Sequence, residues 1–189
     1  PYVDIVQFRA GEADPNHPIP FELEHTPFLK YAENAKKKGL KMKVAYVGGF
    51  HYFDDVEAAV AEGKVDIVSA ARAFISNPNY VQLMQEGRAD DLVPCLRCNK
   101  CHGRSPHDPF VSVCSINPRI GIEHRLDVLE SPARPSICIA VIGGGPAGMK
   151  TAMDLCDRGH KVTLYDAEDH LGGAIYHADF VPFKWTLRD

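Results

Sequence analysis

The chain has 189 residues, of which 45% are hydrophobic and 24% are charged, and its formal net charge is -4. These are the values of a globular protein, and the acidic balance argues against a nucleic-acid or anionic-membrane surface. No stretch approaches the roughly 20 consecutive apolar residues of a membrane span. The first residues lack both a basic and an apolar region, so we expect no signal peptide.

Cysteines are unevenly spread along the chain. Four of the six lie between positions 95 and 114. A disulfide framework is typical of short secreted chains, whereas this crowding favours a metal or cluster site in a reducing compartment. We therefore expect a cytoplasmic protein.

Residues 1–92 contain three apolar stretches separated by amphipathic ones, a pattern that predicts parallel β/α units. We expect strands over residues 3–8, 42–47 and 65–70, and a proline-rich loop over 11–20. Thr26 is the predicted N-cap of the first helix, and Asp54 with Glu57 has capping-box spacing for the second. Helices are expected to begin near Thr26, Asp54 and Asn77 and to end at Gly39, Gly63 and Gly87.

Two further parts follow. The periodicity disappears between Pro94 and Pro135, so we expect residues 93–134 to be an irregular segment held by a ligand. Residues 135–189 begin a new β/α unit, with strands over 137–142 and 161–165 and a helix from Pro146 to Arg158.

The cysteine motif is C-x2-C-x2-C-x12-C. Four thiolates are the usual complement of a [4Fe–4S] cluster, whereas structural zinc usually uses two separated C-x2-C pairs. A cluster is the favoured interpretation, with zinc or four unligated thiols as alternatives. Cys138 and Cys156 are expected to be core residues. The predicted ligands are Cys95, Cys98, Cys101 and Cys114.

A glycine-rich turn, G-x-G-x-x-G, follows the apolar strand 137–142 and opens the next helix. In that context the pattern predicts a dinucleotide site, because the glycines let the backbone approach a pyrophosphate at the helix N-terminus. Asp166 ends the next strand, where an acid binds a ribose hydroxyl, and Gly173 supplies a further turn. The alternative is a tight turn without ligand, and the motif does not separate FAD from NAD. The residues of the turn are Gly143, Gly145, Pro146, Ala147 and Gly148.

Two strand ends in the first part predict a phosphate site. Gly48 and Gly49 follow the second strand directly, and Ala71 and Arg72 follow the third. Backbone amides and a guanidinium fork suit a phosphate dianion, which β/α barrels often bind after their last two strands. A surface ion pair is the alternative role for Arg72.

Taken together, these motifs resemble one known group. They occur in the order Val47-Gly48-Gly49, Ser69-Ala70-Ala71-Arg72, the cysteines with Asn99, Cys114-x2-Asn117-Pro118 and Val141-to-Gly148. That order resembles the iron–sulfur flavoenzymes of the old yellow enzyme superfamily, namely the 2,4-dienoyl-CoA reductase, trimethylamine dehydrogenase and NADH:flavin oxidoreductase group. The resemblance covers nearly the whole chain.

The resemblance implies an α/β fold with three parts. These are the C-terminal part of an FMN-binding TIM barrel (1–92), the iron–sulfur segment (93–134) and the first βαβ unit of a Rossmann-like domain for FAD, ADP or NAD(P) (135–189). The first site would hold the FMN phosphate, the cysteines the cluster, and the glycine turn the dinucleotide. Asp166 stands where many members have Glu, and Ala71 where many have Gly. Because a TIM barrel takes about 250 residues, we expect this chain to be an internal fragment.

The implied activity is that of an NAD(P)H-dependent oxidoreductase. Electrons would pass from FAD through the [4Fe–4S] cluster to FMN, which would reduce an activated C=C bond of an enoyl or dienoyl substrate. An oxidative amine dehydrogenase, a subunit resembling the glutamate synthase small subunit and a zinc-stabilised binding module are the rivals. The expected partner is a small molecule, and a homo-oligomer is left open.

No catalytic acid is assigned. Four residues are candidates by type only, and we expect them to have surface or loop roles instead. They are His51, Tyr52, His102 and His107.

Overall fold

The computed structural model describes residues 2–9, 25–102 and 113–180, and these form parts of two compact units, Pro1–Pro118 and Arg119–Asp189. The loop predicted over 11–20 and His107 lie outside the described residues. The three-part division at 92 and 134 stays a prediction, and the two units divide the chain differently, between Pro118 and Arg119.

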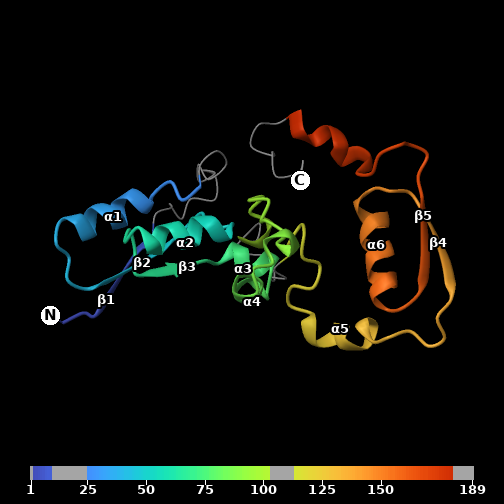
Figure 1. Ribbon diagram of the computed structural model, residues 1–189, viewed down its shortest axis with the longest axis horizontal. Coiled ribbons are helices and arrows are strands. Elements are labelled where there is room, and N and C mark those ends of the chain that lie inside the picture. Colours follow the sequence, from blue (N-terminus) through green and yellow to red (C-terminus); the bar gives the residue numbers. More distant parts are fainter. Residues whose placement is uncertain (1, 10–24, 103–112, 181–189) are drawn as a thin grey trace, which may run out of the picture. The chain divides into compact units, whose positions relative to one another are not determined.

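The first unit is built on a parallel sheet in the order β1-β2-β3. Its strands are β1 (Ile5–Arg9), β2 (Lys43–Val47) and β3 (Ile67–Ser69), and the crossovers are α1 (Leu29–Lys37) and α2 (Phe53–Ala61). Figure 1 shows these elements following one another along the chain, and α1 packs on β2 while α2 packs on β3. The predicted β/α repeat is confirmed.

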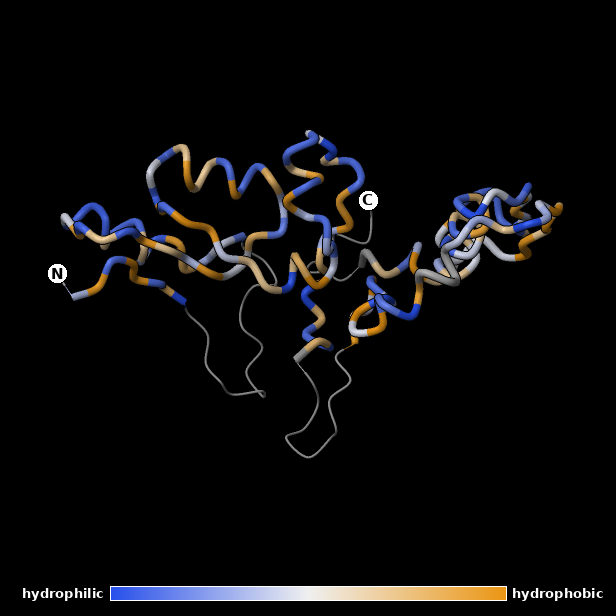
Figure 2. Tube along the Cα trace, turned by 90° about the horizontal axis from the view of Figure 1, so that it is seen from below, coloured by the Kyte–Doolittle hydropathy of each residue, from blue (hydrophilic) through white to orange (hydrophobic). Residues whose placement is uncertain are grey.

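The core of this unit lies between the sheet and its helices. Val44 and Tyr46 of β2 are at most 1% exposed, and the Tyr46 ring meets the buried Phe50 ring edge-on at 5.7 Å. In Figure 2 the tube changes repeatedly between hydrophilic and hydrophobic residues along the elements of the first unit, as expected where one face is covered. The buried residues of this core are Leu29, Ala32, Val44, Tyr46, Phe50, Ala59 and Val65.

Both predicted helix caps are wrong. Thr26 has a φ of 46°, and its backbone runs close against Gly49. The Leu29 N–H donates to the carbonyl of Thr26, not to its hydroxyl. The N-cap of α1 is Phe28 and that of α2 is Tyr52, and neither makes a side-chain cap. Asp54 lies in the first turn of α2, where the helix dipole favours an acid.

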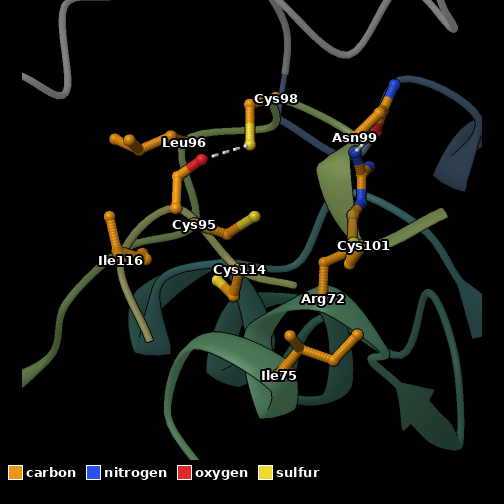
Figure 3. Close-up of a pocket in the computed structure, with 10 residues that line it drawn as sticks. Arg72, Ile75, Cys95, Leu96, Cys98, Asn99, Cys101, Cys114 and Ile116 are labelled. Atoms are coloured by element: carbon orange, nitrogen blue, oxygen red, sulfur yellow. Dashed lines mark hydrogen bonds between the residues drawn. The ribbon is translucent and has the colours of Figure 1, made fainter. Parts of the chain in front are cut away.

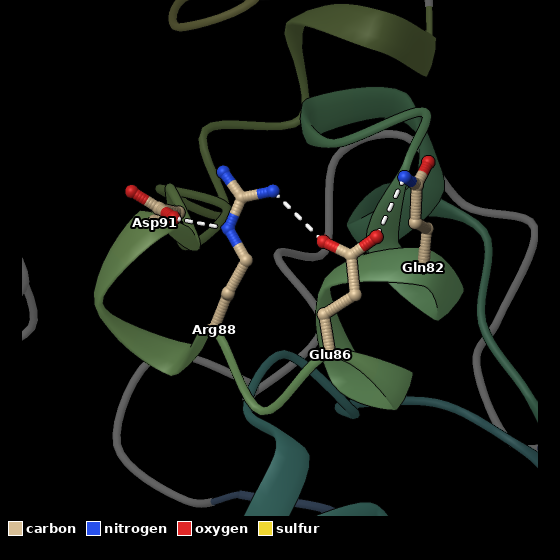
Figure 4. A network of polar contacts seen from close by, with 4 residues as sticks. All are labelled: Gln82, Glu86, Arg88 and Asp91. Carbon is tan, nitrogen blue, oxygen red and sulfur yellow. Dashed lines mark hydrogen bonds and ion pairs between the residues drawn. The ribbon is translucent and has the colours of Figure 1, made fainter.

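After β3 the chain forms short helices that lead toward the cysteines. These are α3 (Arg72–Ser76), α4 (Tyr80–Gln85), η1 (Ala89–Asp91) and η2 (Lys100–His102). Asn77 lies between α3 and α4, so the helix predicted to open there begins three residues later. Figure 4 shows Arg88 bridging Glu86 and Asp91 at the end of α4, and Glu86 also accepts from Gln82. These side chains are exposed, so the network contributes little stability.

The second unit contains α5 (Glu123–Glu130), β4 (Cys138–Ile142), α6 (Pro146–Asp157), β5 (Lys161–Tyr165) and η3 (Gly173–Phe180). β4 and β5 pair in parallel and α6 packs on both, so the predicted strand–helix–strand order is present, whereas its place in a Rossmann-like domain stays a prediction. Helix α5 falls in the segment predicted to be irregular, so that part of the prediction is wrong.

The small sheet of the second unit is covered on one face only. Along β4 and β5 exposed residues alternate with partly covered ones. Cys138 lies on the exposed face, and Cys156 is exposed on α6. The prediction that these two cysteines belong to a core is therefore wrong for the described structure, because Cys138 lies on the sheet face that α6 leaves open and Cys156 lies on an exposed side of α6.

Candidate functional site

The ends of β2 and β3 lie side by side, because Val47 pairs with Ser69 in the parallel ladder. Gly48 and Gly49 therefore leave the sheet next to the start of α3. Both glycines have positive φ, and a Cβ on Gly49 would lie 2.6 Å from the backbone N of Thr26. Only glycine fits this close approach, which leaves the turn without side chains.

Arg72, the first residue of α3, extends from the strand end toward the cysteines. Its Nη1 donates to Oδ1 of Asn99 at 2.6 Å, and Figure 3 shows this pair at the edge of one pocket. The predicted phosphate residues thus lie at neighbouring strand ends, but the Arg72 guanidinium also contacts the cysteine segment. Phosphate binding by these residues stays a prediction.

All four predicted cysteine ligands line a single pocket of the first unit. The space between its lining residues amounts to about 290 Å³, a volume that includes open solvent. Figure 3 shows Cys95, Cys98 and Cys114 drawn around this space, and Cys101 completes the set. Within the described ranges no three Cys, His, Asp or Glu side chains are placed to hold a single metal ion.

Two buried asparagines fix the walls of this pocket. Asn77 pairs with both backbone groups of Val93: its Nδ2 donates to the Val93 carbonyl at 2.7 Å, and the Val93 N–H donates to its Oδ1 at 3.0 Å. Asn117 donates to the Ile75 carbonyl at 2.6 Å. Asn77 therefore holds the segment before Cys95 at the C-terminal end of α3. Asn117 holds the segment after Cys114 against α3.

The thiols differ in their electrostatic environment. Burial raises the pKa of Cys95, an effect that the backbone N–H of Arg97 and the charge of Arg72 partly offset. Burial also raises the pKa of Cys101. At Cys98 burial acts in the same direction, but hydrogen bonds from Ser115 and from backbone amides outweigh it and lower the pKa. These donors favour thiolate, the form that binds metal.

In the second unit the glycine turn lies between β4 and α6. A Cβ on Gly148 would lie 1.8 Å from the carbonyl oxygen of Gly143, so this position needs glycine for helix and strand to pack. Gly145 is the N-cap of α6 and has open space on its Cβ side. A helix start without a capping side chain suits a pyrophosphate.

Two predicted residues gather at this turn. A Cβ on Gly173 would lie 3.2 Å from the Cα of Gly145. The Asp166 carboxylate accepts from the backbone N–H groups of Glu168, at 2.8 Å, and of Gly144, and these bonds lower its pKa. The contact of Asp166 with a ribose stays a prediction.

Comparison with known proteins gives the same order of parts. The NADH:flavin oxidoreductase / NADH oxidase family matches residues 5–91, and an NAD(P)-binding Rossmann-like domain matches residues 141–186. This chain belongs to the old yellow enzyme superfamily. Within that superfamily it falls in the branch that resembles dehydrogenases such as trimethylamine dehydrogenase.

Individual relatives of this superfamily are similar over nearly the whole chain. NADH oxidase of Thermoanaerobacter brockii is 33% identical over 98% of the chain, and dimethylamine dehydrogenase of Hyphomicrobium is 28% identical over all of it. A solved 2-naphthoyl-CoA reductase aligns over 99% of the chain with a TM-score of 0.86 and 28% identity. The chain spans 29%, 26% and 28% of these three proteins. A solved histamine dehydrogenase of Rhizobium aligns over 89% of the chain with a TM-score of 0.73 and 24% identity, and the chain spans 25% of it.

The structure also shows the environments of two of the residues that were candidates for a catalytic acid by type only. His51, expected to have a surface or loop role, lies in the loop between β2 and α2, but it is buried there, at only 4% exposed. It directly follows Phe50, which belongs to the buried core. This apolar neighbour is the one signal in the sequence that points to the burial of His51. Tyr52 stacks on His25 at 5.1 Å, whereas the side chain of His102 lies outside the described part.

Proposed function

We propose that this chain belongs to an NAD(P)H-dependent flavin and iron–sulfur oxidoreductase that reduces an activated C=C bond, such as that of an enoyl or dienoyl substrate. The observation that carries the proposal is the single pocket lined by Cys95, Cys98, Cys101 and Cys114, next to parallel strand ends that match an FMN enzyme family. A [4Fe–4S] cluster takes one thiolate per iron, and the C-x2-C-x2-C-x12-C spacing favours it over zinc, which usually uses two separated C-x2-C pairs.

Each group would be held by residues of this chain. The turn at Gly48 and Gly49, with Ala71 and Arg72, would bind the FMN phosphate. The glycine turn of the second unit would bind the pyrophosphate of FAD, or of ADP, with Asp166 near the ribose. When bound, the flavins supply hydride transfer and the cluster supplies single-electron transfer. The protein contributes placement, and the thiolates favour a reducing, cytoplasmic location.

Metal analysis of the full-length protein tests the cluster. After anaerobic purification we expect about four irons and four acid-labile sulfides per chain and no stoichiometric zinc. Cys101→Ser should lower the iron content, whereas Cys138→Ser, an exposed cysteine outside the pocket, should leave it unchanged. One zinc without sulfide, or equal effects of the two variants, would contradict the assignment.

Flavin analysis and turnover assays test the proposed flavin cofactors and the proposed reaction. Acid-released cofactors should include FMN together with FAD or ADP, and NADH or NADPH should be consumed when an enoyl thioester is added. The absence of FMN would contradict the barrel assignment.

An oxidative amine dehydrogenase is the second candidate, and the similarity to dimethylamine dehydrogenase favours it. Reduction of the flavin by a secondary or tertiary amine without nicotinamide would establish that direction. The match of residues 5–91 to an FMN family disfavours an electron-transfer subunit that lacks a barrel.

A further inference from the structure

His51 is a buried histidine that the proposed function leaves without a role. It lies two residues after Gly49, beyond the end of β2, and is 4% exposed. Neither Nδ1 nor Nε2 has a hydrogen-bond partner within the described part of the chain. A buried polar group without a partner costs free energy and calls for an explanation, because most such groups are paired.

Cationic groups gather around this imidazole. Burial, followed by the charges of Arg72, Arg97 and His25, lowers the pKa of His51 to about 3. Arg97 is itself only 8% exposed. Asp55, an acid of the same region, is hydrogen-bonded to Nδ1 of His25 at 2.7 Å.

This environment matches one class of ligand. A neutral imidazole has one N–H to donate. A phosphate dianion attracts guanidinium groups and accepts such donors at close range. The strand-end glycines just before His51 carry backbone N–H groups and no side chains of their own, which suits the same anion. A buried N–H, two guanidinium groups and a glycine turn therefore all favour a phosphate.

We propose that His51 is a positioning residue that donates a hydrogen bond to the phosphate monoester of the flavin nucleotide at Gly48 and Gly49. The inference rests on the proposed function, because it takes FMN as the ligand of that turn. His51 thereby separates FMN from flavins that lack a phosphate, and it does not take part in the redox chemistry.

Comparing FMN with riboflavin tests this role, because the two ligands differ only in the phosphate. Full-length apoprotein is titrated with each flavin, and binding is followed by quenching of flavin fluorescence. His51→Leu keeps an apolar side chain of similar size but removes the N–H, and His51→Asn restores a donor. His124→Leu removes an exposed histidine of α5 and is the matched control.

For His51→Leu we expect FMN to bind about 10- to 100-fold more weakly, the range of a charge-assisted hydrogen bond, with riboflavin changed less than about twofold. His51→Asn should recover part of the FMN affinity, and His124→Leu should match the wild type. Riboflavin binding also reports that the variants fold.

Other outcomes overturn the inference. Equal losses for both flavins would show that His51 only fills space, and unchanged FMN affinity would remove it from the phosphate site. Both results leave the proposed function standing. A wild-type protein that binds neither flavin would refute the proposed function and the inference with it.

Discussion

Replacing Asn77 should loosen the cysteine pocket without touching a cysteine. The side chain is 5% exposed and forms two hydrogen bonds to the backbone of Val93, two residues before Cys95. In Asn77→Ala both backbone groups lose their partner. In Asn77→Asp an oxygen replaces the amide nitrogen that donates to the Val93 carbonyl, so an attraction becomes a repulsion.

The size of the effect follows from these contacts. At about 1 kcal/mol net for each hydrogen bond, Asn77→Ala should make local opening of this segment easier by about 2 kcal/mol. Since about 1.4 kcal/mol corresponds to a factor of ten, iron bound as proposed at these cysteines should leave the opened site about 30-fold faster. Asn77→Asp should exceed this, at about 3 kcal/mol and on the order of 100-fold, because the buried carboxylate keeps only the Val93 N–H as a donor and faces the Val93 carbonyl.

The assay is the rate at which a coloured chelator takes up iron from the full-length protein. Asn79→Ala is the matched control, because Asn79 is exposed and makes no side-chain cap on α4. We expect its rate to stay within about twofold of the wild type. Asn77→Asp releasing iron as slowly as Asn79→Ala would refute the reasoning.

Three further predictions follow from the described contacts. In the folded chain the pKa of His51 is lowered from 6.5 to about 3. Between these pH values the unfolded chain binds a proton at His51 that the folded chain does not bind. The free energy of unfolding should therefore fall as the pH drops from 6.5 toward 3. The slope in urea unfolding at pH 7, 6 and 5 should approach about 1.4 kcal/mol per pH unit, and a His51→Leu slope as steep as the wild type's would contradict it. Gly49→Ala should lower the melting temperature of the protein clearly more than Gly63→Ala. Both glycines have positive φ, but only at Gly49 would an added Cβ lie against Thr26. Equal melting temperatures of the two variants would contradict the predicted clash with Thr26. Gly148→Ala should lower the melting temperature, whereas Gly145→Ala, with open space, should keep it and weaken adenine-nucleotide binding measured by calorimetry.

The regular elements could be predicted because their signals are local. Apolar runs and glycine stops place β2, β4, α6 and β5 within a residue or two of their observed ends. The caps at Thr26 and Asp54 could not be predicted. The Thr26 backbone is set by its contact with Gly49, a residue more than twenty positions away, and no propensity of Thr26 itself describes that contact.

Side-chain environments were harder to predict for the same reason. The grouping of the four cysteines was predicted because three of them lie within seven residues of one another. The burial of His51 and the Arg72–Asn99 bond depend on how α3 and the cysteine segment fold back onto the strand ends. The exposure of Cys138 shows the reverse case, in which an apolar strand predicts burial but only one face of its sheet is covered in this chain.

Arg72 links the two candidate sites of the first unit, the strand-end glycine turn and the cysteine pocket. It begins α3 directly after the strand whose end lies beside Gly48 and Gly49, and it donates to Asn99 between two of the cysteines. Ala73, the next residue of this five-residue helix, is buried. A change in the cysteine segment can reach the strand-end turn through the Arg72 side chain and its hydrogen bond to Asn99, beside the links that Asn77 and Asn117 make. For that reason an Asn99 variant that weakens FMN binding is better explained by a displaced Arg72 than by a direct contact of Asn99 with the flavin.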